Sequence, residues 1–169
     1  QLIAAIRKAP GSSVHISIPC TAWCLRQHQN VAMHGPEFAK KLEAQRAASR
    51  LMLKHSLEAA EVALSLGGHV SFEWPRHNSG WLLPELVAFI AQHGLIEGLV
   101  DGCACGMTNA KGKPILKRWR FVCSSPRLAT TLGALRCQHA ASFKHGELTG
   151  GADTAKSAYY TDSLCRSIL

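Results

Sequence analysis

The sequence has little negative charge and no long apolar run. Eleven Asp and Glu residues stand against nineteen Lys and Arg, which gives a formal net charge of +8. Such an excess of cations suits a polyanionic partner, so we expect nucleic acid to be the partner. Because no apolar run approaches the roughly 20 residues that a membrane helix needs, we expect no membrane segment.

A secretory signal pattern and low-complexity tracts are also missing, and the cysteines do not form an even set. Seven cysteines with nine histidines favour free thiols and a metal site over a disulfide framework. These features predict a soluble intracellular protein, nuclear or cytoplasmic. At 169 residues the chain has the length of one domain. We expect a Rossmann-like region at 1–136, with a Cys/His-rich loop and a short helix at 137–169 packed on the same domain.

The hydrophobic pattern predicts an α/β fold with three parallel strands and one antiparallel strand, flanked by helices in three layers. Short apolar runs rich in β-branched residues indicate strands, and Pro and Gly signals bound the helices. The segment at 26–35 is polar and predicts a loop. The expected strands are 14–18, 69–73, 95–100 and 115–124, and the expected helices are 36–66, 83–93, 127–136 and a last one after Asp162.

Two of these strands end in residues that suit nucleophilic chemistry. Cys20 follows Pro19 just beyond the first strand, and Glu73 ends the second. Adjacent parallel strands bring both side chains to one edge of a sheet, where a thiolate and a carboxylate would face the same substrate. Arg118 and Arg120 lie two residues apart on the fourth strand, so they share a face and are candidates to orient Glu73 or hold a phosphate.

The order Pro-Cys, strand-end Glu and Arg-x-Arg resembles that of DNA cytosine-5 methyltransferases. The resemblance covers about residues 14 to 123 and implies the second half of a Rossmann-type catalytic fold. It implies that Cys20 attacks C6 of a flipped cytosine, that Glu73 contacts N3, and that Arg118 and Arg120 support the site. A partial or degenerate enzyme of this kind, from a mobile-element or phage-type polyprotein, is the first functional hypothesis.

The sequence also departs from that family. Its Phe-Gly-Gly-type loop for S-adenosylmethionine has no counterpart here and would lie before Gln1, so this cofactor is expected only if an N-terminal half exists. Trp74-Pro75 replaces the Asn-Val that follows the family's Glu. If the missing strands are absent, the sheet edge left exposed predicts a homodimer or docking on a larger assembly.

Cysteines and histidines gather in two stretches of the C-terminal half. Thiolates and imidazoles are the ligands that zinc prefers, and four of them close a tetrahedral structural site. The second hypothesis is therefore a non-catalytic, zinc-stabilised interaction module that docks on nucleic acid or a larger assembly; buried thiols and surface imidazoles are the alternative to zinc. The candidate ligands are Cys103, Cys105, Cys137, His139 and His145.

A basic segment overlaps the fourth strand. Cations interleaved with an aromatic residue suit binding along a phosphate backbone, with Trp119 stacked on a base. A solvated hairpin whose Trp packs inward fits the pattern equally well. The candidate nucleic-acid residues are Lys111, Lys113, Lys117 and Trp119. A third functional hypothesis is a cysteine-dependent hydrolase in which a histidine serves Cys20 as base.

Overall fold

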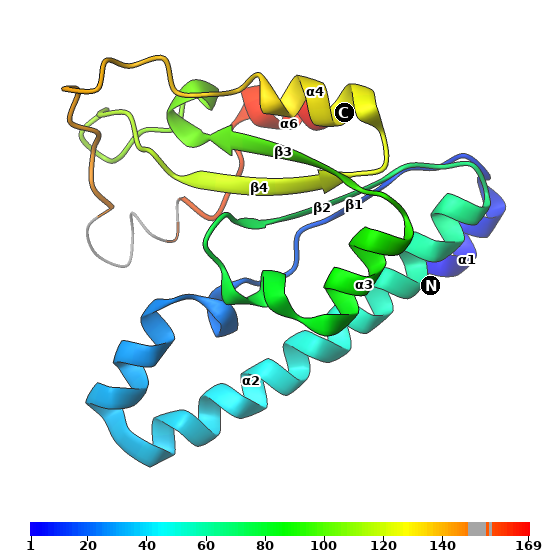
Figure 1. Ribbon diagram of the computed structural model, residues 1–169, viewed down its shortest axis with the longest axis horizontal. Helices are drawn as coiled ribbons and strands as arrows, with labels where there is room; N and C mark the ends of the chain where they lie inside the picture. Colours follow the sequence, from blue (N-terminus) through cyan, green and yellow to red (C-terminus); the bar gives the residue numbers. More distant parts are fainter. Residues whose placement is uncertain (149–154, 156) are drawn as a thin grey trace.

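The computed structural model describes residues 1–148, 155 and 157–169 (Figure 1). A four-stranded open sheet lies between two groups of helices, which gives the expected three layers of an α/β fold. No helix in the described part of the chain is long and apolar enough to cross a membrane. The strands are β1 (Val14–Ile16), β2 (Val70–Pro75), β3 (Ile96–Asp101) and β4 (Arg118–Cys123).

The strand order is β1-β2-β4-β3, which differs from a sheet of three neighbouring parallel strands. Among the four described strands, β1 and β2 are the only parallel neighbours; β4 lies between β2 and β3 and is antiparallel to both. The fourth strand therefore returns antiparallel as predicted, but it separates the two strands that precede it. In the described sheet, β1 and β3 are the edge strands.

The two faces of the sheet carry different cores because strand side chains alternate between faces. Phe72, Trp74 and Val122 pack against one group of helices, and Phe121 and Cys123 pack against the other. In Figure 1 the first group lies below the sheet and the second above it. The first comprises α1 (Leu2–Lys8), α2 (Arg26–Ser65) and α3 (Pro84–Gln92); the second comprises α4 (Pro126–Gly133) and α6 (Asp162–Ile168).

The expected loop at 26–35 is wrong, because these residues are helical. α2 consists of two helical pieces that meet at Gly35, whose φ of 70° interrupts the helix just before Pro36. Only glycine adopts such a conformation without strain, and Pro36 then begins the second piece at a position where its missing N–H costs nothing. Polar composition alone did not distinguish a solvated helix from a loop.

The other helix ends follow the sequence signals closely. Gly67, with a φ of 78°, comes just after α2 as the expected left-handed turn. Ser125 Oγ accepts the N–H of Leu128 over 3.3 Å and so caps α4. Part of the Cys/His-rich region expected at 137–169, namely 149–154 and 156, lies outside the described residues.

Candidate functional site

Glu73 lies on the sheet face that α4 and α6 cover. In the register of β2 and β4, Glu73 is directly opposite Phe121, whereas Trp74 is opposite Arg120. Cross-strand partners share a face and neighbours along a strand alternate, so Glu73 and Arg120 project from opposite faces of the sheet. This alternation decides which residues lie near Glu73.

The Glu73 carboxylate is buried and held by one of its two oxygens. Glu73 as a whole is 4% exposed to solvent. Oε2 accepts the hydroxyl of Tyr160 over 2.5 Å and that of Ser17 over 3.0 Å. Oε1 is buried and has no hydrogen-bond partner among the residues that the structure describes. One carboxylate oxygen is thus fixed while the other remains available to a further group.

Burial raises the pKa of Glu73 above its usual value. The hydrogen bonds from Tyr160 and Ser17 and the charge of Lys117 oppose this rise without cancelling it. A carboxyl group with a raised pKa carries a proton more readily than an ordinary one, and its protonated form donates a hydrogen bond as well as accepting one.

The hydroxyl of Tyr160 connects Glu73 to the edge strand. It lies 3.2 Å from His15 Nε2, and His15 Nδ1 lies 2.8 Å from Ser71 Oγ. Thr161, the next residue, donates its hydroxyl to the carbonyl of Cys105 over 2.7 Å and thereby fixes this segment to the 3-10 helix that follows β3. Sequence reasoning missed Tyr160 and Ser17, because neither belongs to a motif and Tyr160 approaches from the far end of the chain.

Cys20 lies beyond β1, in the turn that the sequence predicted. Two side chains from the end of β2 and just after it hold this turn: Trp74 Nε1 donates to the Ile18 carbonyl over 2.8 Å, and Asn78 Nδ2 donates to the Cys20 carbonyl over 3.0 Å. Because β1 and β2 are parallel neighbours, the expectation that both strand ends meet at one sheet edge is confirmed.

The Cys20 thiol is half-buried, and burial raises its pKa. The positive charge of Lys117 lowers this pKa, while the carboxylate of Glu73 raises it. Among the residues that the structure describes, no histidine forms a hydrogen bond with Cys20, so the general base of the hydrolase hypothesis has no counterpart in this geometry.

Arg118 and Arg120 are not near Glu73, contrary to the expectation that they orient it. Arg118 Nε lies 3.6 Å from Asp101 Oδ1, and Arg120 Nε pairs with Glu97 Oε2 at 2.5 Å. The alternation of β4 puts both arginines on the face opposite Glu73, where Arg120 also lies over the ring of Trp81.

The candidate nucleic-acid residues of the basic segment differ in their exposure to solvent. Lys111 and Lys113 are exposed before β4, but Trp119 is only 2% exposed within the second core. A ring buried to this degree does not stack on a base, so the expected stacking role of Trp119 is wrong for this conformation. Lys117 is half-buried, and its Nζ donates to the Ser157 carbonyl over 2.6 Å.

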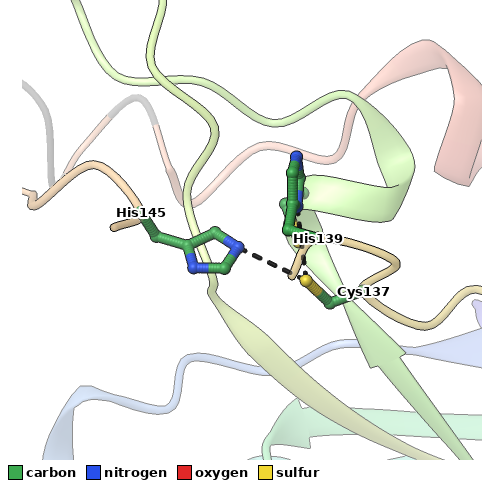
Figure 2. A group of neighbouring side chains, drawn as sticks. Cys137, His139 and His145 are labelled. Carbon is green, nitrogen blue, oxygen red and sulfur yellow. Dashed lines mark hydrogen bonds between the residues drawn. The ribbon is translucent and has the colours of Figure 1, made fainter. Parts of the chain in front are cut away.

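Two cysteines and two histidines form a second cluster, and Figure 2 shows three of them, Cys137, His139 and His145. Cys137 Sγ lies 3.3 Å from His139 Nδ1 and 3.4 Å from His145 Nε2. With Cys103 Sγ, these four ligand atoms all lie within 4.8 Å of one another. A tetrahedral ion with bonds of 2.0–2.3 Å separates its ligands by about 3.5 Å, so the four residues could hold a metal ion. We call Cys103, Cys137, His139 and His145 the metal cluster.

Cys105 is not part of the metal cluster, contrary to expectation. The chain turns through a short 3-10 helix at Gly102–Cys105, which directs Cys103 toward Cys137 and leaves Cys105 1% exposed in the second core. Two residues that alternate along a strand would share a face, but the tighter turn separates their side chains. Spacing in the sequence did not reveal this turn.

Asp101 fixes the metal cluster to the end of β3. Its Oδ2 accepts the backbone N–H of Cys137 and the Nε of Arg136, each over 3.0 Å. Burial raises the pKa of Asp101, but these hydrogen bonds and the charges of Arg136 and Arg118 outweigh that effect and lower it. The ionised carboxylate therefore holds Cys137 beside the turn that carries Cys103.

In comparisons with known proteins, no family model, curated protein or solved structure matches this chain. Its functional assignment therefore depends on the geometry of Cys20 and Glu73 and on that of the metal cluster.

Proposed function

We propose that this chain is a cytosine-5 methyltransferase-like, nucleic-acid-associated domain in which Cys20 and Glu73 receive a pyrimidine base. The observation that carries the proposal is the buried Glu73, whose Oε1 lacks a hydrogen-bond partner among the described residues, together with Cys20 in the turn beyond the neighbouring parallel strand β1. A buried oxygen in this state is costly unless a ligand satisfies it. We call Cys20, Glu73 and the groups that hold them the base site.

The chemistry of Glu73 supports a base with an acceptor nitrogen. Because burial favours its protonated form, Glu73 is able to donate a hydrogen bond to N3 of cytosine. Attack by the Cys20 thiolate forms an S–C6 bond, the electrons of the C5–C6 double bond move into the ring, and N3 takes the proton from Glu73. The thiol's own proton goes to solvent. The antiparallel return of β4 also supports the resemblance to a methyltransferase half-fold.

Methyl transfer would require S-adenosylmethionine in addition, and we assign no residue of this chain to it. Our proposal for the chain itself is base recognition with thiol addition. Its net charge of +8 supports nucleic acid as the carrier of the base.

A single-stranded oligonucleotide containing one pyrimidin-2-one, an electrophilic analogue of cytosine, tests the proposal. We expect a covalent complex by intact-mass spectrometry with the wild-type protein and none with Cys20→Ser. Glu73→Gln should slow adduct formation by about 100-fold or more, since it removes a general acid. Cys24→Ser is the matched control, because Cys24 is an exposed thiol near the same turn and should leave the reaction unchanged. No adduct with the wild-type protein would reject the covalent chemistry.

Binding without reaction is tested separately with cytosine-containing single strands. Reversing the charges of the exposed Lys111 and Lys113 should weaken binding. It should also reduce the slope of log affinity against log salt concentration by the amount expected for the loss of about two phosphate contacts. The double reversal of Lys40 and Lys41, exposed on α2, is the control and should have little effect. An equal loss of affinity in the two double variants would indicate non-specific electrostatic attraction rather than a defined interface.

We further propose that the metal cluster binds zinc as a structural ion. Two thiolates and two imidazoles are a donor set that zinc prefers, and the ligands join the turn after β3 to the segment at 137–145. This part of the proposal also fits the alternative of a zinc-stabilised, non-catalytic module that docks on nucleic acid or a larger assembly.

Metal analysis of the purified protein tests the zinc proposal. We expect one zinc per chain in the wild type, loss of zinc in Cys137→Ser and His145→Ala, and full occupancy in Cys105→Ser. Because Cys105 is a buried thiol outside the cluster, its variant controls for general damage to the fold. Substoichiometric zinc in the wild type after growth with added zinc would reject the site.

A further inference from the structure

Glu73 ends a series of hydrogen bonds that leads from the edge strand to the buried carboxylate. His15 lies directly opposite Ser71 in the register of β1 and β2, and its Nδ1 lies 2.8 Å from Ser71 Oγ. On the other side of the ring, Nε2 lies 3.2 Å from the hydroxyl oxygen of Tyr160, which donates to Glu73 Oε2 over 2.5 Å. We call this series, from Ser71 through His15 and Tyr160 to Glu73, the hydrogen-bond chain.

Aromatic contacts hold the two rings of the hydrogen-bond chain in place. The His15 ring stacks on Phe121, with centroids 5.9 Å apart and an angle of 23° between the ring planes. The Tyr160 ring meets Trp119 edge-on, with centroids 6.1 Å apart, and its centroid lies 6.4 Å from that of Phe121. Because Phe121 and Trp119 belong to the second core, this packing restricts the rotamers of His15 and Tyr160.

A second hydroxyl on Glu73 Oε2 indicates where the hydrogens lie. Ser17 Oγ donates to Oε2 over 3.0 Å, so two hydroxyls converge on one oxygen of the carboxyl group. A proton on Oε2 itself would turn one of these acceptor contacts into a donor contact. Two converging donors therefore favour Oε2 as an acceptor, with the hydrogens of Ser17 and Tyr160 pointing toward it.

The direction of the remaining hydrogens follows from that of Tyr160. Because the only hydrogen of the Tyr160 hydroxyl points to Glu73, its oxygen accepts from His15 Nε2. Burial lowers the pKa of His15, which favours the neutral ring. In a neutral ring with a hydrogen on Nε2, Nδ1 is the acceptor, and the Ser71 hydroxyl donates to it.

We propose that Tyr160 and His15 are positioning residues of the base site: their hydrogens run toward Glu73 Oε2, so that the proton of neutral Glu73 lies on Oε1. This inference rests on the proposed function for the identity of the ligand, but the direction of the hydrogens requires no ligand. Oε1 is the buried oxygen without a partner among the described residues. A proton there makes Oε1 a donor, which pairs with an unprotonated ring nitrogen and opposes an N–H group.

The position of this proton distinguishes two pyrimidines that differ at one ring nitrogen. N3 of cytosine is an acceptor, whereas N3 of uracil carries a hydrogen. A donor on Oε1 pairs with cytosine and leaves the N3–H of uracil without an acceptor, which lowers affinity roughly ten- to a hundredfold in a buried site. If the hydrogens ran the other way, the proton would lie on Oε2, Oε1 would accept, and uracil would be favoured.

The tautomer of His15 tests the direction of the hydrogen-bond chain without nucleic acid. Long-range proton–nitrogen correlation spectra distinguish the two neutral forms of an imidazole ring, and the His15 signals are those that disappear in His15→Gln. At about pH 8, where a histidine with a lowered pKa is neutral, we expect the Nε2–H form. The Nδ1–H form would overturn the proposal, because Nε2 would then accept the hydrogen of Tyr160.

Binding of single-stranded oligonucleotides tests the consequence for the ligand. Each strand carries one cytosine or one uracil between abasic positions, in buffer at about pH 6 to favour neutral Glu73. We expect the wild type to bind the cytosine strand roughly tenfold or more tightly than the uracil strand. Tyr160→Phe and Ser17→Ala should each bring this ratio closer to one, because each frees Oε2 to carry the proton. Tyr159→Phe, at a residue that is 76% exposed, is the control and should keep the wild-type ratio.

Equal affinity of the wild type for the two strands, or an unchanged ratio in folded Tyr160→Phe, would overturn the role of the hydrogen-bond chain. If Tyr160→Phe does not fold, an unchanged ratio in Ser17→Ala would overturn it instead. If neither strand binds, the base site of the proposed function is rejected, whereas the Nε2–H form of His15 would still support the direction of the hydrogens.

Discussion

Tyr160 donates its hydroxyl to Glu73 Oε2 over 2.5 Å, although the two residues are 87 positions apart. This contact joins the C-terminal segment to the second strand and fixes one oxygen of the carboxylate. It thereby leaves Oε1 as the oxygen available to a ligand.

Tyr160→Phe should destabilise the protein and raise the pKa of Glu73 further. The hydrogen bond from Tyr160 stabilises the ionised carboxylate, and the variant lacks it. Removing one partner from a buried carboxylate costs about 1–3 kcal/mol, measurable by urea denaturation. Tyr159→Phe is the matched control: Tyr159 is 76% exposed and its substitution should change stability by less than about 0.5 kcal/mol. Equal stability of the two variants would contradict the importance of the contact.

The raised pKa of Glu73 predicts how stability depends on pH. The folded state holds the Glu73 proton more tightly than the unfolded state, so this residue's contribution to stability falls as pH rises from the unfolded pKa through the folded one. Glu73→Gln removes that dependence. Relative to the wild type, the variant should therefore become progressively more stable as pH rises, as measured by denaturant midpoints across the pH range. A difference that stays constant with pH would show that Glu73 does not titrate with a raised pKa.

Asp101→Asn should weaken zinc binding although Asp101 is not a ligand. Its carboxylate accepts the N–H of Cys137 and the Nε of Arg136, and such supporting contacts typically account for a 10–100-fold difference in metal affinity. Competition with a chromophoric chelator measures the effect. Glu97→Gln, an exposed carboxylate of the same strand, should retain wild-type affinity. Unchanged affinity in Asp101→Asn would show that the metal cluster does not depend on this anchor.

Trp119→Ala should destabilise the fold by about 3–5 kcal/mol, since it removes a large side chain that is 2% exposed in the second core. Chemical denaturation measures this loss. If Trp119 instead acted as a surface platform for a base, nucleic-acid binding would fall while stability remained near the wild-type value, and that result would contradict the buried position.

The sequence by itself determined the secondary structure near the base site and the position of its thiol. The β-branched run before Pro19 and the apolar run before Glu73 predicted two parallel neighbouring strands, and β1 and β2 form that pair. Local signals suffice here because alternation, turn residues and helix caps act over a few positions. The same local signals failed at 26–35, where a solvated helix and a loop have similar composition.

Only the tertiary structure decided which residues surround Glu73. The alternation of side chains along β4 showed that Arg118 and Arg120 share a face of the sheet. Because helices cover both faces, the sequence pattern did not show which face that is. The register of β4 beside β2 placed that pair on the face opposite Glu73. The tight turn at Gly102–Cys105 selected Cys103 over Cys105, and chain closure brought Tyr160 to Glu73. Contacts at such sequence separation depend on how the whole sheet and its helices pack, which no local pattern encodes.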